Sequence, residues 1–220
     1  FLSSLKELTA LSVPLTANRI LLNILQSIEA VSIPVQLRVF GMDTNNALRM
    51  YGVLTGMALP LVLFPTAVSN SIASMTLPAI AELQASRNHT AIKIFVSRLC
   101  LGSLLLGAMC SVVFLFGGSL AGIWLFHSSL AGKFITTLAW ICPFLYTNSI
   151  LTSIINGLGK PFISFLYNSL HLIIRILSIY IYIPQKGIYG YLIGLLFSQV
   201  LLFFLSLQFL YRYFQKGETL

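Results

Sequence analysis

Six long apolar runs limit how this chain can fold more than any other feature. They lie near residues 9–37, 48–80, 91–117, 133–157, 161–183 and 187–213. A hydrocarbon core about 30 Å thick is crossed by about 20 residues of apolar helix. Only 8% of the 220 residues are charged, against about a quarter in soluble domains. The sequence therefore predicts an all-α, polytopic membrane protein, with a bundle of about six transmembrane helices over residues 1–220.

The second run is too long for one straight crossing. About 33 residues of helix reach about 50 Å, and this run contains Pro60, Pro65 and Pro78. We expect it to kink or to project beyond the bilayer. Residues 117–126, GGSLAGIWLF, predict a short interfacial helix with Trp124 at the level of the lipid headgroups.

Basic residues in short loops predict the orientation, because cytoplasmic loops carry an excess of them. An even number of crossings returns the chain to its starting side. Seven basic residues fall on the side of the N-terminus, namely Lys6, Arg87, Lys93, Arg98, Lys160, Arg212 and Lys216. Four fall on the other side, namely Arg38, Arg49, Lys133 and Lys186. We expect both ends to be cytoplasmic, in a bacterial plasma membrane.

Polar residues share one face of the first run. With a turn of about 100° per residue, they occupy an arc of about 140°: Thr16, Arg19, Asn23, Gln26 and Glu29. Arg19 and Glu29 are about 15 Å apart along the axis and cannot neutralise each other. Because charges within a span normally face a bundle interior or an aqueous cavity, we expect this face to line a cavity. A structural ion pair with another helix is the alternative.

The fifth run carries a second polar face. Its members recur at spacings of three and four: Ser164, Asn168, His171, Arg175, Ser178 and Tyr182. An ion pair between Arg175 and Glu29 is geometrically open, and His171 is either a proton relay or a hydrogen-bonded packing residue. The fourth run adds polar groups that line the cavity or join helices: Thr147, Asn148, Ser149, Thr152, Ser153 and Asn156.

Together these faces predict a hydrophilic cavity of net positive potential, suited to a phosphate or pyrophosphate. The candidate substrate-binding residues are Arg19, Asn23, Gln26, Asn168, His171 and Arg175. The chain lacks paired carboxylates, metal-binding motifs and nucleophile motifs, so we expect no enzyme, no cofactor and no metal site. Its basic residues are scattered singly, which excludes the dense basic stripe of a nucleic-acid-binding protein.

Several stretches resemble a known family. PLTANRILLNILQSIEAVSIPVQL and YGVLTGMALPLVLFPTAVSNSIASMTLPAIAELQA are similar to the start of the C-terminal lobe in the stage V sporulation protein B-like polysaccharide-biosynthesis membrane proteins. NGLGKPFISFLYN and GIYGYLIGLLFSQV resemble the end of that lobe. The family lies in the multidrug, oligosaccharidyl-lipid and polysaccharide exporter superfamily.

The resemblance implies a transporter of two six-helix lobes that opens a central cavity alternately to either side. This chain would be the C-terminal lobe, with its own N-terminal lobe, membrane lipids and a lipid-linked sugar as partners. Some relatives bind a cation, with Na⁺ or H⁺ as the coupling ion, through an acidic residue on the first helix of this lobe, and Glu29 is the matching residue. A second acidic ligand has no counterpart in the fifth run, where Asn168 and His171 stand.

The function expected is that of a flippase for lipid-linked oligosaccharide or peptidoglycan precursors, whose pyrophosphate Arg19 and Arg175 attract. One alternative is a cation-coupled multidrug exporter, and another is a non-transporting scaffold in cell-envelope or spore assembly. A membrane enzyme such as a ligase would require a large catalytic loop, and no loop here is long enough.

Overall fold

A computed structural model describes residues 2–86 and 89–217, and this part of the chain is helical apart from short turns. The elements are α1 (Leu2–Val39), α2 (Thr44–Val53), the π-helical turn η1 (Leu54–Ala58), α3 (Leu59–Leu63), α4 (Thr66–Ala85), α5 (His89–Phe126), α6 (Ser129–Leu138), the 3₁₀ turn η2 (Ala139–Ile141), α7 (Cys142–Gly157), α8 (Pro161–Lys186) and α9 (Ile188–Gly217). The predicted all-α class is confirmed.

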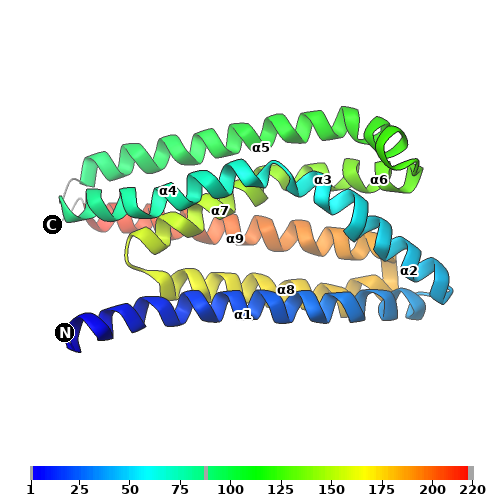
Figure 1. Cartoon of the computed structure of the whole chain (residues 1–220), viewed down its shortest axis with the longest axis horizontal. Coiled ribbons are helices and arrows are strands. Elements are labelled where there is room, and N and C mark those ends of the chain that lie inside the picture. The colour runs from blue at the N-terminus through cyan, green and yellow to red at the C-terminus, as the bar shows by residue number, and fades with distance from the viewer. Residues whose placement is uncertain (1, 87–88, 218–220) are drawn as a thin grey trace.

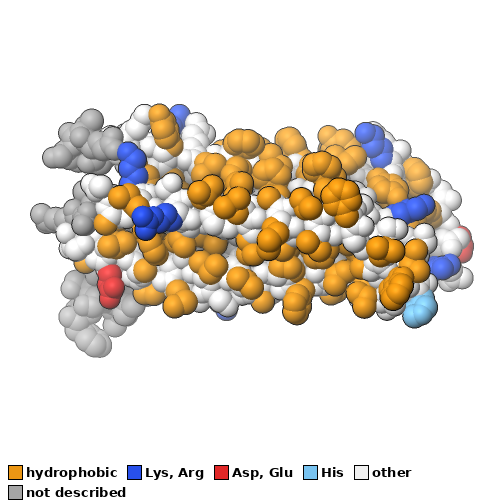
Figure 2. Space-filling view, turned by 90° about the horizontal axis from the view of Figure 1, so that it is seen from above, with side chains coloured by type: hydrophobic (Ala, Val, Ile, Leu, Met, Phe, Trp, Pro, Cys, Tyr) orange, Lys and Arg blue, Asp and Glu red, His pale blue; other side chains and the backbone are white. Residues whose placement is uncertain are grey.

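The helices run along one long axis and cross the molecule six times (Figure 1). Six segments of the described chain are long and apolar enough to span a membrane. Both ends of the described chain lie at the same end of the bundle, as an even number of crossings requires. Figure 2 shows hydrophobic side chains across the middle of one face, with most Lys and Arg side chains toward its two ends. The molecule is a multi-pass membrane protein.

The second crossing is bent, as predicted, and its bend has two local causes. The Leu59 N–H donates to the carbonyl of Leu54, five residues earlier, which forms the π-helical turn just before Pro60. Pro65 has no N–H to donate and falls between α3 and α4. The crossing therefore consists of α2, η1 and α3 in one direction and α4 in another (Figure 1).

The third crossing corrects one prediction. Residues 117–126 do not form a separate interfacial helix, because α5 continues through them to Phe126. Glycines in this segment are positions of close helix packing. A Cβ atom on Gly122 would lie 2.2 Å from the backbone nitrogen of Gly132 in α6, so only glycine allows α5 and α6 to pack this closely. Trp124 is nevertheless exposed, near the end of the helix.

Polar residues of α7 join it to its neighbours. Ser149 Oγ donates to Asn70 Oδ1 in α4 at 2.7 Å, and Ser153 Oγ donates to the carbonyl of Ala73. Just before them on the same helix, Thr147 contacts α5 and Asn148 contacts α9. Of the two roles predicted for the polar groups of the fourth run, these contacts support helix joining. They fix α7 at the centre of the bundle.

Candidate functional site

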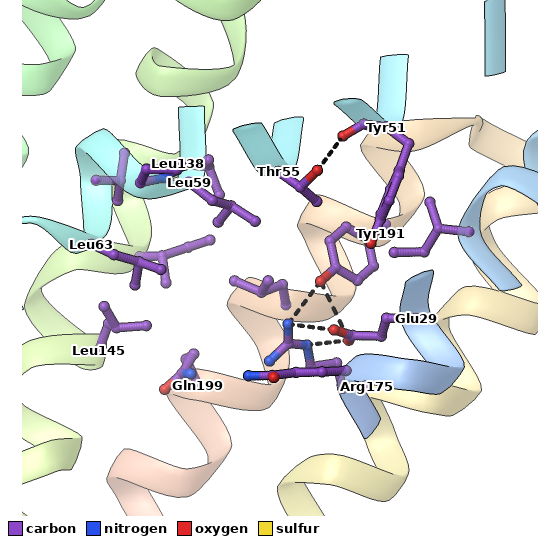
Figure 3. A pocket seen from close by; sticks show the side chains of 16 residues that line it. Glu29, Tyr51, Thr55, Leu59, Leu63, Leu138, Leu145, Arg175, Tyr191 and Gln199 are labelled. Carbon is purple, nitrogen blue, oxygen red and sulfur yellow. Dashed lines mark hydrogen bonds and ion pairs between the residues drawn. The ribbon is translucent and has the colours of Figure 1, made fainter. Parts of the chain in front are cut away.

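A cavity of about 410 Å³ lies between α1, the bent second crossing, α8 and α9. Its apolar wall comes mainly from the second crossing and from α6 and α7, with Leu59, Leu63, Leu138 and Leu145 facing it (Figure 3). Its polar lining comes from five elements: Gln26, Glu29, Tyr51, Thr55, Arg175, Tyr191 and Gln199. This volume lies within the range of small-molecule sites.

An ion pair between Glu29 and Arg175 forms one wall of this cavity (Figure 3). Arg175 Nε lies 2.6 Å from Glu29 Oε1, and Arg175 Nη2 donates to Glu29 Oε2 at 2.9 Å. The Nη2 contact is a charge-assisted hydrogen bond, whereas the Nε contact is an ion pair without hydrogen-bond geometry. The ion pair that the sequence left open between these two residues is confirmed.

Tyr191 completes the cluster from α9. Its hydroxyl accepts a hydrogen bond from Arg175 Nη2 at 2.8 Å and donates to Glu29 Oε1 at 3.3 Å. The guanidinium carbon of Arg175 also lies 5.8 Å from the centre of the tyrosine ring. Glu29 is 6% exposed and Tyr191 2% exposed, so the charges are shielded by protein on most sides. We call these three residues the Glu29–Arg175–Tyr191 cluster.

Local sequence explains why these residues meet. Leu25 and Ile33 are both buried, and Glu29 lies between them, one helical turn from each. The Glu29 carboxylate is therefore on the inner face of α1. On α9, Gly190 and Gly194 flank Tyr191 and let α9 approach α8 closely. A Cβ on Gly194 would lie 2.2 Å from the Cβ of Ser178. The close packing of α8 and α9 thereby holds the Tyr191 side chain against Arg175.

A second buried polar contact lies beside the cavity, between α7 and α9. Asn148 Nδ2 donates to the side-chain oxygen of Gln199 at 2.8 Å and to its backbone carbonyl at 2.9 Å. Gln199 lines the cavity, whereas Asn148 lies behind it. The Oδ1 atom of Asn148 is buried and makes no hydrogen bond within the described chain.

The predicted substrate-binding residues separate into three groups. Gln26 and Arg175 line the cavity. Arg19 and Asn23 are exposed on α1, outside its lining. Asn168 and His171 are on α8 and do not line it either. The Asn168 amide donates to the Ser164 carbonyl of its own helix at 2.9 Å. Their binding roles stay predictions.

Sequence patterns did not identify four further lining residues: Tyr51, Thr55, Tyr191 and Gln199. Tyr191 and Gln199 lie eight residues apart on α9, which is the spacing of one helical face and was the available signal. Among the described residues, no group of three or more His, Cys, Asp or Glu side chains could hold a metal ion. The cavity offers one carboxylate, one guanidinium, amides and hydroxyls. This set can bind an anion or a small cation but contains no paired acid and base for hydrolysis.

Comparison with known proteins agrees with this fold. No protein-family model matches the chain. Stage V sporulation protein B of Bacillus subtilis (strain 168) is 32% identical over 89 residues, covering 37% of this chain and 17% of that protein. The resemblance inferred from the sequence is thus confirmed.

Two solved structures share the fold. One is an outward-facing multidrug resistance MATE family transporter of the MOP superfamily, with a TM-score of 0.76 and 18% identity. The other is a MOP superfamily transporter from Pyrococcus furiosus Vc1 (DSM3638), with a TM-score of 0.75 and 17% identity, whose reversed pocket polarity suggests a different function. Each match covers 93% of this chain and 44% of the other. The chain spans less than half the length of the proteins it matches and has the fold of about half of a MOP superfamily transporter.

Proposed function

We propose that this chain, with the fold of about half of a MOP superfamily transporter, is the C-terminal lobe of a flippase. The lobe spans residues 1–220, and its partner is the N-terminal lobe of the same protein. The substrate is a lipid-linked oligosaccharide or peptidoglycan precursor in the bacterial plasma membrane. The resemblance of the first two spans to polysaccharide-biosynthesis membrane proteins supports this substrate class, and the similarity to stage V sporulation protein B agrees with that resemblance. The fold supports movement by alternating access rather than catalysis.

The observation that carries the proposal is the Glu29–Arg175–Tyr191 cluster in the wall of a membrane-embedded cavity. A buried ion pair contributes little net stability compared with apolar packing, and ionisable residues within spans commonly mark substrate or ion pathways. Among the residues that line the cavity, Arg175 carries the positive charge that suits a pyrophosphate. Because Glu29 already neutralises it, substrate binding proceeds by exchange, with the pyrophosphate replacing the carboxylate on the guanidinium. Arg19 acts from the exposed side of α1, as a first contact outside this cavity.

The experiment uses the full-length protein in proteoliposomes and a fluorescent polyprenyl-pyrophosphate sugar. Transbilayer movement is compared between wild type, Arg175→Gln, Arg19→Gln and the matched control Arg49→Gln, an exposed arginine outside the cavity lining. We expect the first substitution to abolish movement, the second to reduce it, and the control to leave it unchanged. Normal movement in a folded Arg175→Gln variant would contradict the proposed role. A wild-type protein that binds the lipid without moving it would instead support the scaffold function.

A cation-coupled multidrug exporter is the second candidate function, and Glu29 is the residue that favours it. The carboxylate is buried in the wall of a cavity, in a fold shared with a multidrug resistance MATE family transporter. In this mechanism Na⁺ or H⁺ binds Glu29 in place of Arg175. Dependence of transport on an imposed Na⁺ or pH gradient, lost in Glu29→Gln, distinguishes it from an uncoupled flippase.

A further inference from the structure

A second concavity opens on the outside of the bundle, between α5 and α9. Both helices pack against α7 but barely contact each other, which leaves a groove of about 410 Å³ between them. We call it the α5–α9 groove. Its walls are mostly apolar, with Val96 and Leu104 on one side and Phe203 and Leu207 on the other. Thr147 of α7 also lines it and is fully buried, so this residue lies at its floor.

The α5–α9 groove is separate from the Glu29–Arg175–Tyr191 cavity. Thr147 lines the groove, and the next residue, Asn148, is hydrogen-bonded to Gln199 of the cavity wall. The hydroxyl of Thr147 contacts Ser103 Oγ of α5 at 3.3 Å. The contacts that α7 makes with α5 and α9 therefore lie between the two spaces. A ligand in the groove would therefore lie outside the Glu29–Arg175–Tyr191 cavity.

The groove has one basic end. Lys93 lines it near the start of α5, at the end of the bundle where both described termini lie. From Lys93 to Leu104 the groove follows α5 for about 16 Å, which is a large part of one membrane leaflet. Tyr211 also lines it from the last turns of α9, and its side chain is 67% exposed. The groove thus combines long apolar walls with a cation and a hydroxyl at its outer end.

We propose that the α5–α9 groove is a binding site for one anionic glycerophospholipid. An acyl chain lies along Val96, Leu104, Phe203 and Leu207, and the phosphate lies at Lys93. The charge pattern supports a lipid over a protein helix, because a single cation at the surface end of an apolar groove matches a ligand with one charged head and a hydrocarbon tail. The separation from the transport cavity supports a resident phospholipid over the transported substrate.

The test is native mass spectrometry of the purified full-length protein with phosphatidylglycerol or phosphatidylcholine added at equal concentrations. We expect wild type to retain one phosphatidylglycerol in preference to phosphatidylcholine. Lys93→Ala should weaken phosphatidylglycerol retention about fivefold, the factor that corresponds to about 1 kcal/mol for one lysine at an anionic surface. Lys160→Ala is the matched control, since Lys160 is an exposed lysine outside the groove, just before the start of α8.

A second pair of variants tests the groove without changing charge. Leu101 lines it and Leu105 does not, and the two side chains are 60% and 59% exposed on the same helix. Leu101→Trp should reduce retention of both lipids, whereas Leu105→Trp should leave it unchanged. Equal retention in Lys93→Ala and wild type, equal losses in the two lysine variants, or wild-type retention in Leu101→Trp would each overturn the proposal. Stoichiometric displacement of phosphatidylglycerol by a polyprenyl pyrophosphate would assign the groove to that ligand instead.

Discussion

Tyr146 of α7 donates a hydrogen bond to the backbone carbonyl oxygen of Val62 in α3, at 2.7 Å. The tyrosine is fully buried, and its hydroxyl reaches the second crossing just before the break at Pro65. The contact joins the bent crossing to the central helix of the bundle. It therefore fixes the bend from outside the helix that contains it.

The Tyr146→Phe variant tests this contact. We expect the unfolding free energy to fall by about 1 to 3 kcal/mol, because the substitution removes one partner of a buried hydrogen bond. Thermal unfolding in detergent measures the loss. Tyr189→Phe is the control, since Tyr189 is 44% exposed. Equal melting temperatures in the two variants would show that the buried hydroxyl does not stabilise the bend.

A double-mutant cycle on Glu29 and Arg175 measures how strongly they depend on each other. Removing either partner of a buried ion pair costs about 3 to 5 kcal/mol, because the remaining charge is left unpaired. We expect Glu29→Gln and Arg175→Gln each to destabilise the protein, and the double variant to lose less than the two singles together. Chemical unfolding gives these values. Strict additivity would mean that the two side chains are independent.

Close packing of α8 on α9 predicts an effect of Gly194→Ala. The new Cβ would lie 2.2 Å from both Cβ and Oγ of Ser178, so we expect a loss of about 1 to 3 kcal/mol from overpacking. Adding Ser178→Gly should restore most of the stability, because it removes the atoms in conflict. Gly102→Ala is the control, as a Cβ there meets no atom within 4 Å. Failure of the second substitution to rescue would indicate a different cause.

The orientation can be tested with single cysteines in a protein from which Cys100, Cys110 and Cys142 have been replaced. The substitutions are Lys160→Cys, just before the start of α8, and Lys186→Cys, at its last residue. The start of α8 is toward the end of the bundle that holds both termini (Figure 1). We expect a membrane-impermeant thiol reagent added to intact cells to label position 186 and to spare position 160 until the membrane is opened. The reverse pattern would place both ends outside the cytoplasm.

Hydrophobic length and proline positions predicted most of the fold, because a membrane leaves a chain few alternatives to helices. Residues 117–126 were predicted as a separate interfacial helix, but they continue α5. Gly118 instead allows α5 and α6 to pack closely, because a Cβ on Gly118 would lie 2.9 Å from Ile135 Cγ2. Contacts of this kind depend on which helix is the neighbour, and one sequence does not contain that information.

The candidate site was predictable in part for a related reason. Helical periodicity correctly grouped Glu29 with polar neighbours, but position along the axis decides which of them share a cavity. Arg19 lies about 15 Å from Glu29 along α1, too far to reach the same space. Tyr191 was missed because a tyrosine in an apolar helix resembles a packing residue until Arg175 is seen beside its hydroxyl.

The break at Pro65 also determines how far the end of α4 moves when the angle between α3 and α4 changes. Helix α4 has 20 residues and is about 30 Å long, so a change of about 10° at the break displaces its far end by about 5 Å. The hydrogen bonds from Ser149 and Ser153 tie α7 to α4, and the hydrogen bond from Tyr146 ties α7 to α3 on the other side of the break. A displacement of α4 comparable to one full helical turn would therefore require α7 to lose its contacts with one side of the break.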